Sequence, residues 1–513
     1  MKYPIGIQSF EVIRRGGYVY VDKTLLMHRL VSEGKYYFLS RPRRFGKSLL
    51  LSTLEAYFLC KKELFEGLAV AENETEWTTY PILHLDLNTE KYETKQSLDK
   101  ILDSNLKDWE AIYKPDIQGE TLSDRFMRVI RQAYKQTGRQ VVILVDEYDK
   151  PLLQAIGNDP LQNEYRSTLK AFYGALKTCD RYIRFAFPTG VTKFGKVSVF
   201  SDLNNLTDLS LDKRYSTICG ITEQELHDYF DESVQFLASE NGMGKEECYE
   251  RLQYDYDGYH FSIGSVGVYN PFSVLNTLSA RQFSDYWFET GTPSFLVCQL
   301  QKTDYQLDYL TEEELTADTL NSIDVMDDNP LPLLYQSGYL TLKDYDPRFR
   351  TYRLQYPNRE VREGFIRYLV PYYTPKHRDK SKFFIRNFVQ EMESGDAEGF
   401  MRRLESFFSK GDYQLMGDKE VYFHNAIYVF FTLLGFYVEV ERHTTDGRMD
   451  ILAQTPHYIY IFELKINQSA EAALQQIEKK GYAKPFVDDP RQLFKIGVNF
   501  STEPRTIDEW KAV

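Results

Sequence analysis

Residues 40–51 read SRPRRFGKSLLL, and they join the β-rich run KYYFLS (35–40) to an apolar helical stretch (48–59). A strand, a tight turn and a helix N-terminus form the setting of a phosphate-binding loop, because backbone N–H groups and the helix dipole then face the phosphates. Lys47 would neutralise the β- and γ-phosphates of ATP, and the Ser48 hydroxyl would bind Mg²⁺. The stretch therefore predicts a nucleotide-binding domain built around this loop.

The loop departs from the usual pattern at its start. Arg41 occupies the position of the usual first glycine, and Pro42 follows it. Gly46 is present, and it lets the backbone approach a phosphate closely. The alternative is a basic turn before a buried helix, so the backbone path of the loop stays open at this point. The expected nucleotide-binding residues are Arg44, Phe45, Gly46, Lys47, Ser48, Leu49, Asp146 and Thr189.

A second motif further along the chain supports the first. Residues 140–152 read QVVILVDEYDKPL, an apolar strand that ends in Asp146 and Glu147. We expect Asp146 to hold Mg²⁺ through water and Glu147 to polarise the attacking water. Asp149 is a candidate accessory acid. On its own this run would also fit an ordinary strand end, and the phosphate-binding loop before it favours the catalytic interpretation.

A third apolar strand lies within RFAFPTGVTKF (184–194) and ends at Thr189. A polar residue at the tip of such a strand can sense the γ-phosphate. Asn204 and Asn205 follow in VSVFSDLNNL (197–206). These two asparagines fit such a role and ordinary turn positions equally well.

The pattern of elements changes along the chain. Strands and helices alternate over residues 1–210, which favours a parallel sheet with crossover helices. Helical patterns dominate residues 211–345, where LPLLYQSGYLTL (331–342) fits a helix end, a glycine turn and a strand, as in small winged-helix domains. Residues 346–412 have the spacing of connecting helices. We expect residues 413–513 to form a second α/β unit with the order helix, three strands, helix and strand. The predicted fold class is therefore α/β, with a helical, winged-helix-like region in the middle of the chain.

The C-terminal unit contains the pattern D…E-x-K. Asp450 ends GRMD, and the later FELK holds Glu463 and Lys465. The last two are two positions apart on one strand, so both project from one face. The carboxylates of Asp450 and Glu463, with the backbone carbonyl of Leu464, would bind Mg²⁺, which prefers hard oxygen ligands. Lys465 would orient or help deprotonate the attacking water and stabilise the charge that develops on the phosphate.

Four residues on neighbouring helices extend this pattern. Glu420 and His424 flank the preceding helix and would add a metal contact, although a buried structural histidine is the common alternative. Gln476 and Tyr482 on the following helix would touch the scissile phosphate, unless that helix simply faces solvent. Because apolar and charged residues alternate in FELK, Glu463 and Lys465 also fit a strand face that is exposed to solvent.

Composition limits the classes of function. The chain has 513 residues, a net charge of −13 and a pI of about 5.3, so a basic nucleic-acid coat protein is disfavoured. An enzyme needs only a local basic groove. Five scattered cysteines give neither a disulfide framework nor a zinc site. We find no signal peptide and no run of about 20 apolar residues, so we expect a cytoplasmic protein without membrane contact.

These motifs together resemble a family of bacterial proteins with an AAA-ATPase-like N-terminal domain and a PD-(D/E)XK nuclease-superfamily C-terminal domain. The resemblance covers nearly the whole chain, although Met449 stands where the name-giving Pro of the superfamily would be. It implies a P-loop NTPase fold, a restriction-endonuclease-like C-terminal fold and a place for YVDKT (20–24) near the adenine. The matching stretches include FLSRPRRFGKSLLLSTL (38–54), VDEYDKP (145–151), TGVTKF (189–194), FSDLNNL (200–206), DGYHF (257–261), YNPFS (269–273), LLYQSGYLT (333–341), GRMDIL (447–452) and FELKINQSAEAALQQI (462–477).

Two functional hypotheses follow. The first is an ATP-regulated DNA nuclease, a P-loop ATPase joined to a metal-dependent nuclease, with ATP and Mg²⁺ as cofactors and a role in defence or DNA processing. The second is a regulatory ATPase whose nuclease-like domain only binds nucleic acid or a protein partner. Assembly into a homo-oligomer fits either hypothesis. A purely structural scaffold would leave both motifs without a role.

Overall fold

The computed structural model describes residues 1–88, 91–115, 120–193, 199–200, 203, 205–289, 294–321, 329–373, 381–409, 419–445, 448–502 and 506–513. These residues form two compact units. The first contains Met1–Leu296 and Glu313–Val361, and the second contains Val297–Glu312 and Arg362–Val513. The finer domain boundaries expected at residues 210, 345 and 412 stay predictions.

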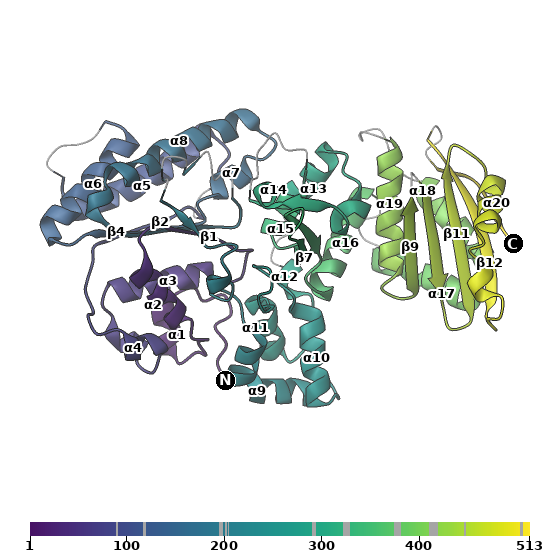
Figure 1. Ribbon diagram of the computed structural model, residues 1–513, viewed down its shortest axis with the longest axis horizontal. Helices are drawn as coiled ribbons and strands as arrows, with labels where there is room; N and C mark the ends of the chain where they lie inside the picture. The colour runs from purple at the N-terminus through teal and green to yellow at the C-terminus, as the bar shows by residue number, and fades with distance from the viewer. Residues whose placement is uncertain are drawn as a thin grey trace. The chain divides into compact units, whose positions relative to one another are not determined.

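A parallel five-stranded sheet lies at the centre of the first unit, as the alternating pattern predicted (Figure 1). Every pair of neighbouring strands in it is parallel, and the order is β2-β3-β4-β1-β5. This order places β3 and β1 on either side of β4, so the carboxyl ends of all three meet at one edge. The strands are β1 (Tyr37–Ser40), β2 (Ile82–Asp86), β3 (Val141–Asp146), β4 (Ile183–Gly190) and β5 (Thr207–Asp208).

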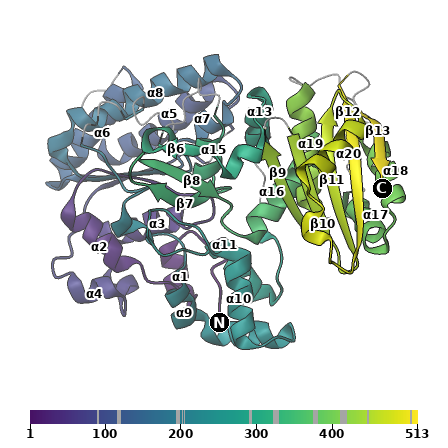
Figure 2. The same ribbon diagram turned by 45° about the vertical axis from the view of Figure 1, so that its right-hand side comes forward.

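Helices cover both faces of this sheet. In both views α5, α6 and α8 lie on one side of the sheet, and α1 to α4 lie on the other (Figures 1 and 2). Their sequences explain them locally: α6 is capped by Thr121, ends at Gly138 with φ 65°, and buries an apolar stripe. The bounds are α1 (Phe10–Gly16), α2 (Thr24–Glu33), α3 (Lys47–Phe58), α4 (Ala69–Asn73), α5 (Lys95–Tyr113), α6 (Leu122–Thr137), α7 (Lys150–Gln154) and α8 (Asp159–Thr178).

A helical subdomain and a small sheet complete the first unit. The helices α9 (Glu223–Glu240), α10 (Lys245–Tyr256) and α11 (Pro271–Ala280) enclose one apolar cluster. The segment expected to be a helix, a glycine turn and a strand is confirmed as α15 (Leu331–Gln336), Gly338 with φ 88° and β7 (Thr341–Asp346). The remaining elements are α12 (Tyr286–Glu289), β6 (Glu314–Thr316), α14 (Ala317–Leu320) and β8 (Thr351–Gln355), with β6, β8 and β7 forming an antiparallel sheet.

The second unit is built on a mixed sheet of order β13-β12-β11-β10-β9, in which only the pairing of β11 with β12 is parallel. The predicted order of helix, three strands, helix and strand is confirmed. The connecting helices expected within residues 346–412 are present as α16, α17 and α18, whereas sequence reasoning missed the last strand, β13. The bounds are α13 (Ser294–Lys302), α16 (Arg359–Tyr373), α17 (Ser381–Ser394), α18 (Ala397–Ser409), α19 (Lys419–Leu434), β9 (Glu439–Thr445), β10 (Arg448–Gln454), β11 (Tyr458–Ile466), α20 (Ala470–Lys480), β12 (Gln492–Ser501) and β13 (Thr506–Ala512).

Alternation along β11 assigns its residues to two buried faces. The Phe462 ring packs against Phe400 of α18 and Phe431 of α19. Its neighbour Ile461 packs instead against Leu474 and Ile477 of α20. Since side chains alternate along a strand, the residues that share the parity of Ile461 lie on the face covered by α20.

The close approach of α20 to the sheet depends on Gly497 of β12. A Cβ on this residue would overlap the Ala470 carbonyl oxygen and come within 3.1 Å of the Ala473 Cβ. We expect Gly497→Ala to lower the free energy of unfolding of the second unit by about 1–3 kcal/mol, because α20 must move away. Thermal denaturation and limited proteolysis would measure this. The matched control is Gly174→Ala on α8, where the added methyl meets open space, and which we expect to be neutral or stabilising.

Candidate functional site

A polar cavity of about 320 Å³ opens where the phosphate-binding loop meets the carboxyl edge of the parallel sheet. The loop contributes Arg43, Arg44, Gly46, Lys47 and Ser48. The other lining residues come from the N-terminal segment, from α3, from the turns after β2 and β3, from the first residue of α7 and from α11: Pro4, Ile5, Gly6, Ile7, Gln8, Leu49, Asn88, Glu147, Lys150, Pro271, Phe272 and Leu275. The cavity therefore brings together residues that the sequence predicted from separate motifs.

Two residues of the loop have a left-handed backbone conformation before α3 begins. Gly46 has φ 95° and precedes the first helical residue, Lys47, while Arg44 has φ 70°. A glycine adopts this conformation without strain, whereas arginine does so rarely. The amino end of α3 consequently opens into the cavity, where its N–H groups favour an anion.

The Lys47 amine is buried and already satisfied by its own loop. It donates to the carbonyl oxygens of Arg41 (3.0 Å) and Pro42 (3.3 Å). It also lies 3.3 Å from a carboxylate oxygen of Glu147. Because a phosphate would compete for the same amine, these contacts hold the lysine at the position where a nucleotide would meet it.

Asp146, Ser48 and Thr189 form a cluster of oxygen atoms behind the cavity. Burial and the neighbouring Glu147 raise the pKa of Asp146, and hydrogen bonds from Ser48 and Thr189 oppose that rise. The Thr189 hydroxyl donates to the Asp146 carboxylate over 2.9 Å, and Thr189 is fully buried. A hydroxyl and a carboxylate in contact are the hard oxygen donors that Mg²⁺ takes at a phosphate-binding loop. Thr189 thus supports Asp146, and its contact with a phosphate stays a prediction.

Asp149, expected as an accessory acid, has a structural role. Its carboxylate is fully buried and accepts hydrogen bonds from the backbone N–H of Val191 (3.1 Å) and of Thr192 (2.6 Å). Burial and the charge of Glu147 raise the pKa of Asp149. The bonds join the turn after β3 to the turn after β4. Glu147, in the turn after β3, has φ 53°, so its backbone is strained where it lines the cavity.

Arg41 and Pro42, the two departures from the usual loop, are anchoring residues. The buried Arg41 guanidinium donates to the carbonyls of Ser210 (2.9 Å) and Tyr215 (3.2 Å), and it lies 4.0 Å from the centre of the Phe261 ring. Burial lowers the pKa of Arg41. Pro42 packs so closely on Gly338 that a Cβ there would come within 2.6 Å of the proline Cβ.

Phe45 and Trp287 extend this anchoring. The Phe45 ring packs edge-on against Tyr259 and Phe261, at centroid distances of 4.8 and 5.4 Å. The Trp287 indole donates to the Arg43 carbonyl over 3.4 Å. The loop is thus held by residues from well beyond the parallel sheet, and no local sequence signal could have revealed these contacts.

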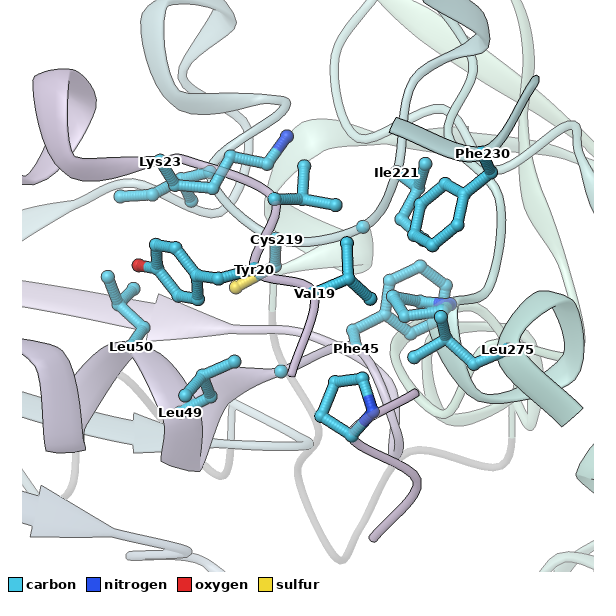
Figure 3. Close-up of a pocket in the computed structure, with 16 residues that line it drawn as sticks. Val19, Tyr20, Lys23, Phe45, Leu49, Leu50, Cys219, Ile221, Phe230 and Leu275 are labelled. Carbon is cyan, nitrogen blue, oxygen red and sulfur yellow. The ribbon is translucent and has the colours of Figure 1, made fainter. Parts of the chain in front are cut away.

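A second, apolar cavity of about 100 Å³ adjoins the first (Figure 3). The two share five lining residues: Pro4, Gly46, Leu49, Pro271 and Leu275. Tyr20, Val21 and Lys23 of the YVDKT stretch line it, together with Phe45 and Ile221. The segment that the resemblance placed near an adenine therefore lies beside the phosphate-binding loop.

The second unit brings Glu463, Lys465 and Gln476 together on the face of β11 that α20 covers. The Glu463 side chain is 0% exposed and that of Lys465 is 4% exposed. The Lys465 amine forms an ion pair with Glu463 and donates to Gln476 Oε1 over 2.7 Å. Burial excludes the alternative of a solvated strand face. Gln476 thus lies beside Lys465, and its contact with a scissile phosphate stays a prediction.

The other predicted residues of this site are placed less fully. Asp450 lies directly across from Glu463 in the β10–β11 register, but its side chain and that of Glu420 lie outside the described part. Leu464 follows Glu463 on β11 and is buried. His424 is buried on α19, and Tyr482 packs against the cluster around Ile477. Among the asparagines after β4, Asn204 also lies outside the described residues, and Asn205 precedes β5.

Comparisons with known proteins agree with the two units. Residues 4–200 match the family model of a predicted AAA-ATPase, and residues 418–510 match that of the PD-(D/E)XK nuclease superfamily. An uncharacterized protein in the vnfD 5′ region of Azotobacter chroococcum mcd 1 is 35% identical over 99% of this chain and 98% of its own length. No solved structure matches.

The chain therefore belongs to the family that joins an AAA-ATPase-like domain to a PD-(D/E)XK nuclease-superfamily domain, as the resemblance implied. Such domains generally use a nucleotide and a divalent metal. Of the helices that the structure describes, none has the length and hydrophobicity needed to cross a bilayer.

The anchoring role of Arg41 can be tested by removing its side chain. We expect Arg41→Ala to lower the free energy of unfolding by about 2–4 kcal/mol, because it removes a donor from three buried carbonyls and opens a cavity. ATP binding should weaken with it. Urea denaturation and ATP titration would measure both effects. Arg139→Ala, at an exposed turn, is the control, and equal stability of the two variants would contradict the role.

Proposed function

We propose that the N-terminal domain binds and hydrolyses ATP and that this reaction controls Mg²⁺-dependent cleavage of DNA phosphodiesters by the C-terminal domain. The observation that carries the proposal is the convergence of Lys47, Ser48 and Glu147 on one cavity, with Asp146 hydrogen-bonded behind it. Defence against foreign DNA or DNA processing would be its biological setting. Phosphoryl chemistry needs this combination of a cation, a hard oxygen pair and a carboxylate.

The two adjoining cavities suit the two halves of a nucleotide. The polar cavity offers cations and the amino end of α3 to the phosphates. The apolar cavity, lined by Val19, Tyr20 and Ile221, would take the base. Gly46 and Leu49 lie in both walls, which supports a single ligand that spans them.

The catalytic roles follow from the contacts in the loop. Lys47 would exchange the carbonyls of its own loop for phosphate oxygens. Glu147 would accept a proton from the attacking water, and its ion pair with Lys47 (3.3 Å) holds the carboxylate at the cavity. Ser48 and Asp146 would hold Mg²⁺, which when bound supplies charge neutralisation for the phosphates.

In the C-terminal domain, Asp450, Glu463 and the carbonyl of Leu464 would hold a divalent ion. That ion, when bound, supplies charge stabilisation for the phosphodiester and activation of water. Lys465 would stabilise the charge on the phosphate, and Gln476 would keep its amine in position. The register of β10 with β11, which sets Asp450 across from Glu463, supports this assignment.

A second function is supported by one observation. Glu463 and Lys465 are almost fully buried under α20, whereas a nuclease must admit a DNA strand to these groups. In this alternative the chain is a regulatory ATPase, and its C-terminal domain binds nucleic acid or a protein partner without cutting. The net charge of −13 is consistent with a protein partner.

The ATPase proposal can be tested with Glu147→Gln. We expect this variant to bind ATP with affinity close to wild type while kcat falls about 10²- to 10³-fold, because the general base is lost and the shape is kept. Lys47→Ala should weaken ATP binding itself. Phosphate release would measure kcat, and nucleotide titration would measure ATP binding. Glu240→Gln on the surface of α9 is the control, and an unchanged kcat in Glu147→Gln would reject the assigned base.

The nuclease proposal can be tested on linear and circular DNA with Mg²⁺, with and without ATP. We expect Lys465→Met to abolish cleavage, because the cation at the phosphate is removed while the buried volume is kept. Loss of cleavage in Lys47→Ala would establish control by ATP. Lys495→Met, at a half-exposed position of β12, should cut as wild type does. Absence of cleavage by wild type, with ATPase activity intact, would favour the regulatory ATPase.

A further inference from the structure

The polar cavity carries an excess of positive charge. Four cationic side chains line it, Arg43, Arg44, Lys47 and Lys150, against the carboxylate of Glu147. The Lys47 amine lies 3.3 Å from that carboxylate. Within the described residues, neither of the two arginines forms an ion pair. Their guanidinium groups are therefore available to an anionic ligand without the loss of an existing salt bridge.

Arg44 differs from Arg43 in how firmly it is held. Its backbone has φ 70°, a conformation that costs a side chain-bearing residue energy. Its guanidinium carbon lies 4.7 Å from the centre of the Phe272 ring, which also lines the cavity. A cation stacked on an aromatic ring keeps its edge free for hydrogen bonds. The stacking on Phe272 places the Arg44 guanidinium along the cavity wall.

The ring that supports Arg44 is itself fixed. Asn270 caps α11, because its side-chain oxygen accepts from the Phe272 N–H over 2.9 Å. Ser273, the next residue, donates to the buried carboxylate of Glu360 over 2.7 Å. The start of α11, which carries the Phe272 ring, is therefore held by hydrogen bonds on both sides of that residue.

We propose that the Arg44 guanidinium binds the terminal phosphate of ATP and stabilises the charge of the hydrolysis reaction, and that it acts on the nucleotide held by its own chain. This proposal rests on the proposed ATP hydrolysis and assigns a further catalytic residue to that site. The ATPase then needs no arginine from a neighbouring subunit.

The chemistry asks for a cation at this place. The water oxygen forms a bond to the γ-phosphorus while the bond to the β,γ-bridging oxygen breaks. The electron pair of that bond stays on the ADP leaving group, and the water proton passes to Glu147. Negative charge grows on the bridging and terminal oxygens, and a guanidinium matches such oxygens with parallel hydrogen bonds.

Steady-state ATPase assays on the full chain test the role of Arg44. The informative variant is Arg44→Gly, because glycine accepts the left-handed backbone and the loop stays folded. We expect kcat to fall about 10²- to 10³-fold, while binding of a fluorescent β,γ-imido ATP analogue changes by less than about fivefold. Arg44→Lys should recover only part of the loss, because an ammonium lacks the planar fork. Arg139→Ala is the matched control at an exposed turn and should keep the wild-type rate.

A mixing experiment tests whether the arginine acts within its own chain. Lys47→Ala chains carry Arg44 but lack the phosphate-binding amine, and Arg44→Gly chains have the reverse defect. We expect the mixture to be no more active than the sum of its parts. Recovery of activity on mixing would show that a neighbouring chain supplies the arginine, and would overturn the proposal.

The remaining outcomes separate this proposal from the proposed function. Wild-type protein that binds the analogue but does not hydrolyse ATP would reject the ATPase function and the role of Arg44 with it. A wild-type rate in Arg44→Gly would overturn Arg44 alone. An equal loss of kcat/KM and of analogue binding, with kcat kept, would make Arg44 a ground-state binding residue and would also overturn its catalytic role.

Discussion

The buried guanidinium of Arg41 is the contact on which the phosphate-binding loop depends. A buried charge is costly unless it is hydrogen-bonded. Here the carbonyls of Ser40, Ser210 and Tyr215 accept from the two terminal nitrogens of the guanidinium, while its buried Nε has no partner among the described residues. Glycine, the usual residue at this position, could make none of these contacts. The loop therefore cannot change its path without moving the segment that follows β5. The proposed nucleotide site is in this way attached to residues beyond the parallel sheet.

This attachment gives a physical route from phosphate binding to the rest of the first unit. The Lys47 amine is satisfied by the carbonyls of Arg41 and Pro42. A phosphate that takes this amine releases both carbonyls, next to the contact of Pro42 with Gly338 in the turn before β7. A ligand shifts a conformational equilibrium only through contacts that differ between the two states. Lys47 would supply such a difference, because a phosphate would replace the carbonyls of Arg41 and Pro42 as its partners. Both carbonyls belong to the loop that joins the parallel sheet to the turn before β7.

The sequence was sufficient where the signal was local. The loop before α3, the acids after β3 and the pair on β11 follow from strand and helix periods over a few residues. It was insufficient where the partner is remote: Arg41 bonds to residues 169 and 174 positions away. Asp149 follows Glu147 and was expected to be an accessory acid. Its partners, the N–H groups of Val191 and Thr192, lie after β4 and give it a structural role. Two-residue β5 is too short to carry a period at all.

The two sites share one arrangement, a buried lysine beside a buried or half-buried glutamate, Lys47 with Glu147 and Lys465 with Glu463. Such a pair is a weak source of stability, because desolvation of both charges offsets their attraction. Under α20 the residues next to this pair and Gln476 include the small Gly497 and Ala473, which lie close together, so packing alone would be met by apolar residues. The proposed function gives the charges a role: each lysine is held by acceptors that a phosphate could replace, and each carboxylate would then be available to a metal or a proton.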